Sequence, residues 1–534
     1  MTPQDSLRGR IVFDGTSTPV KTALFLLVCV AWLLPGLVGH DPWKVDEALV
    51  FGAVQEMLRA GDWLAFRVAG EPYAETAPLF LWTAAAFARA LGGLIPLHDA
   101  ARLAAGLYMA LAMGFVGATC LELIGERSVR IGVLLLIGCL GLLIRAHEMN
   151  PDLAGLAGLS ASLYGLALAL RRQVAGGVVA GVGAGVAFLG NGFLPLAMAA
   201  LTIALLPLAG AAWRTRVYAK TAGIALLCAA PLLAAWPAAL TPWQDPGSTG
   251  KGLAFVYFLK TLPWYAWPAW PLAAWSVWRL RRTLATRAQL LLPLTAFVAF
   301  FIAISLFGEA REVNAMPLLL PLAILGVAEI DTVPRGAASA LDWFGMSTFL
   351  LLGTLVWLAW VAALTGKPQF AAAWLQKEVP DFSYRFSFIG FALGSLLTLL
   401  WLAVAARSLR STRRALVNWT AGITMVWMLL MTLGLPLVEQ SRSYREVAAR
   451  IGSAIPAGNE CVARANVGDA QRALLDYFAG VRTVPLDAPG GSRCRVLLVQ
   501  GSRRGVVDIP GGWSEYWRGA RRGDRNEYFV LYRR

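Results

Sequence analysis

The sequence predicts a polytopic α-helical membrane protein that ends in a small α/β domain. Hydrophobic residues make up 57% of its 534 residues and charged residues only 15%. This leaves too little polar surface to cover soluble domains of such a size. Apolar runs of roughly 17–25 residues, the length that crosses a bilayer as a helix, recur along most of the chain. The segment 438–534 lacks such runs and is hydrophilic.

Thirteen apolar segments are predicted to span the membrane. In chain order they are 22–39, 101–123, 130–147, 152–170, 174–191, 194–210, 220–238, 267–278, 288–308, 315–329, 343–364, 385–405 and 416–437. A further apolar run, 79–96, is expected to lie in the membrane interface, because a crossing there would place the Arg-rich loops outside.

Basic residues gather in short loops between the apolar runs, which is the pattern of cytoplasmic loops. These loops carry Arg171 and Arg172; Arg214, Arg216 and Lys220; Arg279, Arg281, Arg282 and Arg287; and Arg407, Arg410, Arg413 and Arg414. With a cytoplasmic N-terminus, the loop 40–100 and the C-terminal segment are then both predicted on the opposite side of the membrane. The distribution also accounts for the net charge of +15 without a nucleic-acid partner.

The membrane domain is expected to cover 1–437 and the second domain 438–534. In the second domain, "SYREVAARIGSAI" and "DAQRALLDYFAG" have the periodicity of amphipathic helices, while "CRVLLVQG" and "EYFVLYRR" are typical of short strands. Cys461 and Cys494 could pair as a disulfide if this domain faces an oxidising compartment.

Carboxylates crowd the loop that follows the first apolar segment. Asp46 and Glu47 open this loop, and Asp152 follows the outer end of a different predicted span. Carboxylates beside hydrocarbon are costly and are usually functional or paired. Two of them from separate outer loops could converge on one site, where one acts as a general base. The alternative is that Glu47 is a solvated helix residue and Asp152 caps a helix that begins near Leu153.

The first outer loop reads W-x-x-D-E…EML-x-x-GDW…GEPY-x-E-x-x-PL-x-x-W. It resembles the first periplasmic loop of the bacterial aminoarabinose transferase and protein O-mannosyltransferase superfamily, and the likeness continues through "HEMNPDLAG", "FLGNGFLPLAM" and "REVNAMPLLLPLAIL". Members of that superfamily are polytopic glycosyltransferases of the C-type fold that use polyprenyl-phosphate sugars. Their thirteen spans and periplasmic C-terminal domain agree with the topology expected above.

The resemblance implies that Asp46 is a catalytic carboxylate, that Asp152 assists it, and that Glu47 lies next to the site. The residues expected to bind substrate or its phosphate are Glu75, Lys260, Arg311, Arg67, Asn191 and Tyr73.

Several family positions differ in this chain. The E-K-P-P motif reads Glu75-Thr76-Ala77-Pro78, the K-G pair reads Asn191-Gly192, a Tyr is replaced by Asn314, and the loop "FVYFLKTLPWYAWPAWP" lacks the family's His and Arg. The resemblance therefore does not carry over aminoarabinose as the substrate or a bound zinc.

Other cations on the same side could balance a leaving phosphate. They are Lys44, Arg67, Arg145, Lys251, Lys260 and Arg311, of which Lys260 and Arg311 are the preferred phosphate partners. The alternative is that these residues are interface anchors. A divalent metal is possible, with Glu75 and His147 as candidate ligands, while His40 and His98 are expected to be interface residues.

Together these features predict a multi-pass inner-membrane glycosyltransferase with a cytoplasmic N-terminus and a periplasmic C-terminus. It would move a sugar from undecaprenyl phosphate to lipid A, lipopolysaccharide or another envelope glycan or lipid. The alternatives are a protein O-mannosyltransferase-like enzyme and a non-catalytic membrane assembly or transport subunit. A transporter should carry charges near the midpoints of its spans and paired broken helices, and almost none are found.

Overall fold

The structure is a computed structural model of the chain. It describes residues 19–534 apart from 74–75, 237–253, 381, 408–411, 459–460, 503–508, 510, 523 and 525. Glu75 and Lys251, two of the candidate site residues, lie outside the described residues.

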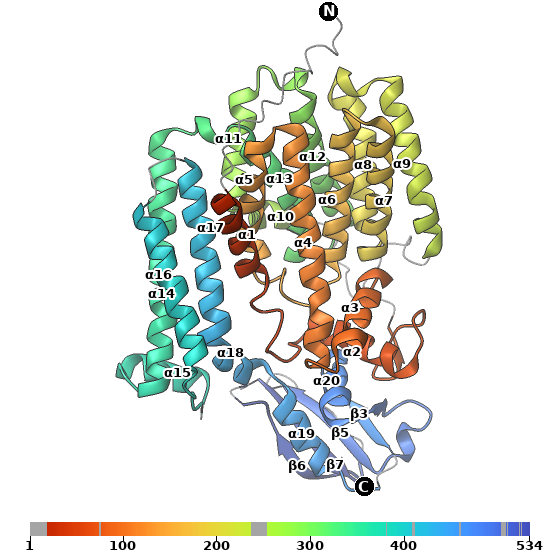
Figure 1. Cartoon of the computed structure of the whole chain (residues 1–534). Coiled ribbons are helices and arrows are strands. Elements are labelled where there is room, and N and C mark those ends of the chain that lie inside the picture. Colours follow the sequence, from red (N-terminus) through yellow and green to blue (C-terminus); the bar gives the residue numbers. More distant parts are fainter. Residues whose placement is uncertain are drawn as a thin grey trace, which may run out of the picture.

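A large helical bundle forms the membrane part (Figure 1). Its helices are α1 (Pro19–Leu33), α4 (Leu97–Leu123), α5 (Glu126–Ile137), α6 (Asp152–Ala169), α7 (Gln173–Asn191), α8 (Phe193–Ala209), α9 (Arg216–Ala235), α10 (Ala254–Tyr265), α11 (Ala269–Leu280), α12 (Ala288–Phe307), α13 (Leu319–Ala328), α14 (Arg335–Thr365), α15 (Gln369–Glu378), α16 (Phe388–Arg407) and α17 (Thr412–Leu429). Among the described residues, eight helical stretches are long and apolar enough to cross a membrane, and four more are apolar but shorter.

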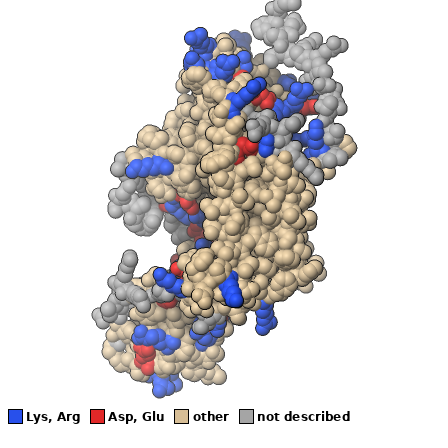
Figure 2. Space-filling model, turned by 90° about the vertical axis from the view of Figure 1, so that its left-hand side faces the viewer, with Lys and Arg blue, Asp and Glu red and all other residues tan. Residues whose placement is uncertain are grey.

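Each predicted span overlaps a helix, although α1 ends at Leu33 and α5 at Ile137, before the ends of the predicted spans 22–39 and 130–147. The predicted fold class is confirmed, while the count of thirteen spans stays a prediction. The structure adds α10 in a stretch that was expected to be an outer loop. This helix has 12 residues and contains Lys260 and Pro263, so it lacks the long apolar run by which a span is recognised. Figure 2 shows a broad face of the bundle with no charged side chain, and charged side chains gathered above and below it.

The helices α6 and α7 pack closely along a seam of small residues. A Cβ at Gly158 would overlap the backbone of Ala187, and one at Gly165 would overlap that of Ala180. Such glycines let two membrane helices approach each other at backbone distance. The antiparallel pair places the first residue of α6 beside the last residue of α7.

The first outer loop lies between the bundle and the C-terminal domain (Figure 1). It contains α2 (Asp46–Ala60), a hairpin of β1 (Arg67–Val68) and β2 (Glu71–Pro72), and α3 (Pro78–Leu91). The run 79–96, expected in the interface, forms α3 and the turn that follows it. Most of α2 is buried because the bundle covers one of its sides and the C-terminal domain another.

The C-terminal domain is a five-stranded sheet with helices packed against it. Its elements are α18 (Leu435–Arg442), α19 (Arg445–Ala454), β3 (Val462–Ala465), α20 (Asp469–Ala479), β4 (Thr483–Pro485), β5 (Val496–Ser502), β6 (Ser514–Gly519) and β7 (Glu527–Arg533). The strand order is β4-β3-β5-β7-β6, with β3 parallel to β4 and β5 and the other pairs antiparallel. Cys461 and Cys494 form a disulfide.

Candidate active site

Asp46 is paired with a cation at the end of the helical bundle next to the C-terminal domain. We call this end the mouth. It is the first residue of α2, where the helix dipole favours a negative charge. The Arg311 guanidinium donates from Nη2 to both carboxylate oxygens of Asp46, at 3.0 and 3.2 Å. Both side chains are about half exposed, at 50% for Asp46 and 52% for Arg311. The pair is therefore accessible to a substrate.

Asp152 lies at the same end of the bundle as Asp46. It is the first residue of α6, and its carboxylate accepts a hydrogen bond from the Asn191 amide at the end of α7. The charges of Arg311 and Asp46 both act on this carboxylate. Asp152, Asn191 and Asn314 line one small pocket. The two outer loops thus bring both predicted carboxylates to the same end of the bundle, where Arg311 pairs with Asp46.

The structure begins α6 at Asp152 itself, one residue before the start expected near Leu153, and its N-cap residue is Pro151. Asn150 accepts the backbone N–H of Asp152 at 3.0 Å. The Asp152 carboxylate is therefore left to face Asn191.

Arg145 links two carboxylates beside this site. Its guanidinium bonds Glu148 at 3.1 Å and Glu312 at 2.7 Å. Burial and the nearby charge of Glu47 raise the pKa of Glu148 to about 7. Sequence reasoning did not select Glu148 or Glu312. Their adjacency to His147 and Arg311 was the available signal.

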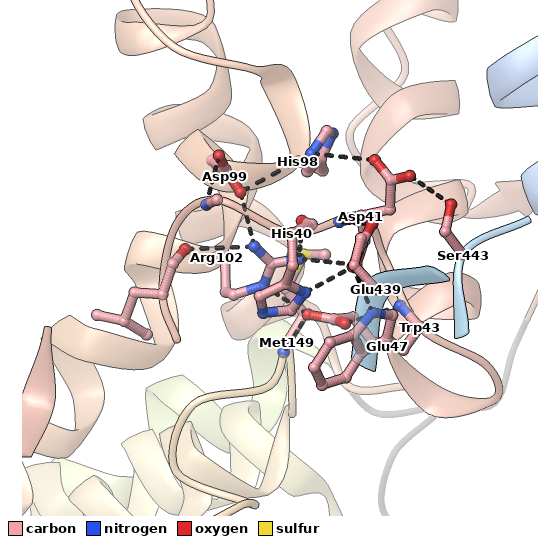
Figure 3. A network of polar contacts seen from close by, with 12 residues as sticks. His40, Asp41, Trp43, Glu47, His98, Asp99, Arg102, Met149, Glu439 and Ser443 are labelled. Atoms are coloured by element: carbon pink, nitrogen blue, oxygen red, sulfur yellow. Dashed lines mark hydrogen bonds and ion pairs between the residues drawn. The ribbon is translucent and has the colours of Figure 1, made fainter. Parts of the chain in front are cut away.

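Glu47 belongs to a buried network of polar contacts (Figure 3). It is 3% exposed and accepts a 2.6 Å bond from Arg102. It also accepts the backbone N–H groups of Trp43 and Met149, at 2.9 and 3.3 Å. Burial raises the pKa of Glu47, but the charges of Arg102 and His40 and the hydrogen bonds from Arg102 and Trp43 together outweigh burial and hold the pKa below its usual value.

Arg102 is the centre of this network. It is fully buried, bonds Asp99 at 2.8 Å, and donates to the carbonyl oxygens of Leu37 and His40. Sequence reasoning passed over Arg102 because it lies inside a predicted span. In the described structure Glu47 therefore ties the loop start and the Met149 turn to α4, and it positions the site from behind.

The network continues to the C-terminal domain (Figure 3). Asp41 is bonded by Ser443 and Arg445, and its backbone N–H donates to Glu439 at 2.9 Å. Burial raises the pKa of Asp41, but the hydrogen bonds from Arg445 and Ser443 lower it below its usual range.

The two histidines expected in the interface are buried instead. His40 and His98 are 5% and 4% exposed. The ring nitrogens of His40 lie within hydrogen-bond distance of the backbone oxygens of Asp41 and Gly36, and Nδ1 of His98 lies 2.9 Å from the Tyr477 hydroxyl.

His147 does not fit the metal-ligand role that was expected of it. Its two ring nitrogens lie 2.6 and 2.7 Å from the backbone oxygens of Leu143 and Trp32, so neither is free to bind a metal. Over the part of the chain that the structure describes, no group of three or more His, Cys, Asp or Glu side chains is arranged to hold a metal ion.

The remaining candidate residues lie on other elements. Lys260 is exposed on α10 and Arg67 on β1, while the Tyr73 hydroxyl lies 2.9 Å from that of Thr76. Lys44 bonds Glu527 of the C-terminal domain at 3.0 Å. Lys44 thus contacts that domain, and its role as a cation for phosphate stays a prediction.

No known family model and no curated protein matches the sequence. Among solved structures, the chain is similar to ArnT from Cupriavidus metallidurans bound to undecaprenyl phosphate, with a TM-score of 0.68 and 18% identity over 96% of this chain and 98% of that one. The apo state of the same protein matches with the same values. The archaeal oligosaccharyltransferase AglB from Archaeoglobus fulgidus, in complex with an inhibitory peptide and a dolichol-phosphate, matches at a TM-score of 0.47 and 10% identity, over 90% of this chain and 70% of that one.

The similarity to ArnT extends over nearly the whole chain. It confirms the C-type glycosyltransferase fold that the first outer loop led us to expect.

Proposed function

We propose that this chain is a polyprenyl-phosphate-dependent glycosyltransferase whose active site contains Asp46 and Asp152. The observation that carries the proposal is the pairing of Asp46 with Arg311 at the end of the bundle where Asp152 begins α6. The fold adds support, because the similar ArnT structure was solved with undecaprenyl phosphate bound.

The chemistry needs a base and a cation close together. An acceptor hydroxyl attacks the anomeric carbon of the sugar, and its proton passes to the Asp46 carboxylate as the new C–O bond forms. The bond from that carbon to the phosphate oxygen breaks, and the electron pair leaves with the lipid phosphate. Arg311, with Lys260 on the neighbouring helix α10, balances the charge that develops on that phosphate.

Asp152 and Glu47 have different supporting roles. Asp152, oriented by Asn191, faces the same small pocket and would hold an acceptor or sugar hydroxyl. Glu47 contacts no open space and positions Asp46 by fixing the start of α2 to Arg102. Glu47 is therefore a positioning residue that acts through Asp46.

The same proposal includes the acceptor and the side of the membrane on which the reaction takes place. The site would face the periplasm at the bacterial inner membrane, where the acceptor is lipid A, lipopolysaccharide or another envelope glycan or lipid. Mass spectrometry of envelope lipids and glycans from a deletion strain identifies which molecule loses its sugar.

Paired variants test the catalytic role. In membranes supplied with lipid-linked sugar, Asp46→Asn and Asp152→Asn should each lower transfer by at least about a hundredfold, since a positioned acid–base group contributes roughly 10²–10⁴. Asp62→Asn is the matched control, because Asp62 is exposed in the same loop and only caps its own turn. Full transfer by Asp46→Asn would exclude its role as the base. A wild-type protein that transfers no sugar from any donor would favour a non-catalytic subunit.

A further inference from the structure

A second cavity lies in the membrane part, away from the carboxylate site. It has a volume of about 500 Å³ and lies between α14, α15 and the end of α17. We call it the α15 groove. Ala363 of α14, Phe370 and Trp374 of α15, and Leu430 after α17 line it. Its size lies within the roughly 300–1,000 Å³ of ligand pockets.

One wall of the groove is shaped by an unusual turn. Residues Leu430–Gly434 form a π-helix between α17 and α18, and Leu430, Leu433 and Gly434 all line the groove. The Tyr384 hydroxyl donates to the carbonyl oxygen of Leu433 at 3.0 Å. Single π-turns within helices are frequent at functional sites. The wall is therefore preformed and held by a side chain from another segment.

The surroundings of the groove select a hydrocarbon occupant. Apart from four aromatic residues, only aliphatic side chains and one glycine line it, so a peptide backbone would find almost no hydrogen-bond partners there. The groove lies along α14, which is apolar enough to cross a membrane, near the end of that helix on the side of the C-terminal domain (Figure 1). An empty groove in a bilayer loses van der Waals contacts on its lining, and a lipid chain restores them.

The charges beside the groove select the headgroup. Lys367 follows α14, Lys377 lies in the last turn of α15, and Arg385 is next to Tyr384. Among the described residues from Lys367 to Arg385, Glu378 is the one acidic side chain, so basic residues outnumber acidic ones there. Basic residues at a membrane surface attract anionic lipids.

We propose that the α15 groove binds one acyl chain of an anionic lipid from the leaflet on the side of the C-terminal domain. The aromatic side chains of α15 cover the chain, and Lys367, Lys377 and Arg385 hold the phosphate of the same lipid. This site is separate from the carboxylate site, and the proposal does not depend on the transferase activity.

Photolabelling of the purified full chain in nanodiscs tests the chain-binding part. The probe is phosphatidylglycerol with a photoreactive group in one acyl chain, and labelled peptides are mapped by mass spectrometry. Ala363→Trp fills the groove and should reduce labelling of the α14, α15 and α17 peptides about tenfold, which corresponds to about 1.4 kcal/mol. Ala359→Trp, on the same wall, is a second variant in case the first fails to fold.

Leu351→Trp is the matched control, because Leu351 lies on α14, is 60% exposed and does not line the groove. It should label as the wild type does. Equal labelling of all lipid-facing helices in the wild type, or unchanged labelling in both filled variants, would overturn the proposal.

A second comparison tests the headgroup. Wild-type labelling should be stronger with the phosphatidylglycerol probe than with the matching phosphatidylcholine probe. Replacing Lys367, Lys377 and Arg385 together with Gln should remove that preference and leave the chain-directed label in the same peptides. Equal labelling by the two probes in the wild type contradicts the choice of an anionic lipid.

Discussion

Asp46 and Glu47 are adjacent carboxylates with opposite environments. Successive side chains of an α-helix point about 100° apart, so the first turn of α2 can turn one outward and the other inward. Asp46 is half exposed beside Arg311, whereas Glu47 is buried against Arg102. A position at the helix start thus separates a group that can meet substrate from one that fixes the backbone.

The buried Glu47–Arg102 pair should control stability. Glu47→Gln or Arg102→Met leaves an unpaired buried group and should cost about 3–5 kcal/mol, while the double variant should cost clearly less than the two losses added together. Thermal unfolding of the purified protein in detergent gives the comparison. Additive losses would mean that the two side chains do not act as a pair.

The Glu148 carboxyl should make stability depend on pH. Its pKa is raised from 4.5 to about 7, so the folded protein holds this proton more tightly than the unfolded chain does. Stability should therefore fall as the pH rises from about 4.5 through 7, by an amount on the order of 1–3 kcal/mol. In Glu148→Gln this part of the dependence should be absent, while Arg145 keeps Glu312 as a partner. Melting temperatures at pH 5 and pH 8 measure it, and an identical pH dependence in the variant contradicts the assignment.

At the scale of elements, the contact of α6 and α7 builds part of the site. The small-residue seam sets the separation of these helices, and that separation places Asp152 within a hydrogen bond of Asn191. A residue deep in the bundle therefore determines the geometry at its mouth.

Gly158→Ala should disturb both packing and site. The added methyl meets the backbone of Ala187, so the helices must move apart. Overpacking of this kind costs about 1–3 kcal/mol, and sugar transfer should fall with the melting temperature. Gly223→Ala in α9 is the control, since no atom lies within 4 Å of its added Cβ. That variant should be neutral or more stable by up to about 1 kcal/mol, and equal losses in both variants would exclude the seam as the cause.

At the scale of the whole molecule, the carboxylates of the first outer loop are divided between two tasks. Glu56 bonds Arg482 at 2.6 Å and Glu71 bonds Arg464 at 2.7 Å, both in the C-terminal domain. Arg59 of α2 likewise pairs with Asp476 at 2.9 Å. Much of the acidity of this loop thus holds the C-terminal domain over α2, and Asp46 is left to face the mouth.

Membrane topology gives a separate prediction for the whole chain. Alkaline phosphatase is active only outside the cytoplasm, so fusions at about residue 150 and at 534 should be active and one at about 283 inactive, as the distribution of Arg and Lys requires. Activity at 283, or inactivity at 534, would reverse the orientation and place Asp46 on the cytoplasmic side.

The sequence by itself determined the helical membrane architecture, the α/β tail, the disulfide partners as a possibility and the choice of Asp46, Asp152 and Arg311. These inferences depend on local composition, on spacing and on a recognisable loop, and none of them requires knowledge of how the helices pack.

Only the tertiary structure decided which charges pair. Glu47 and Lys44 were assigned by their position along the chain and Arg102 received no role, yet each of the three has its partner in a distant element. The α15 groove likewise arises where α14, α15 and a π-turn meet. Ion pairs and cavities depend on distances between segments far apart in sequence, and periodicity along one segment carries no information about those distances.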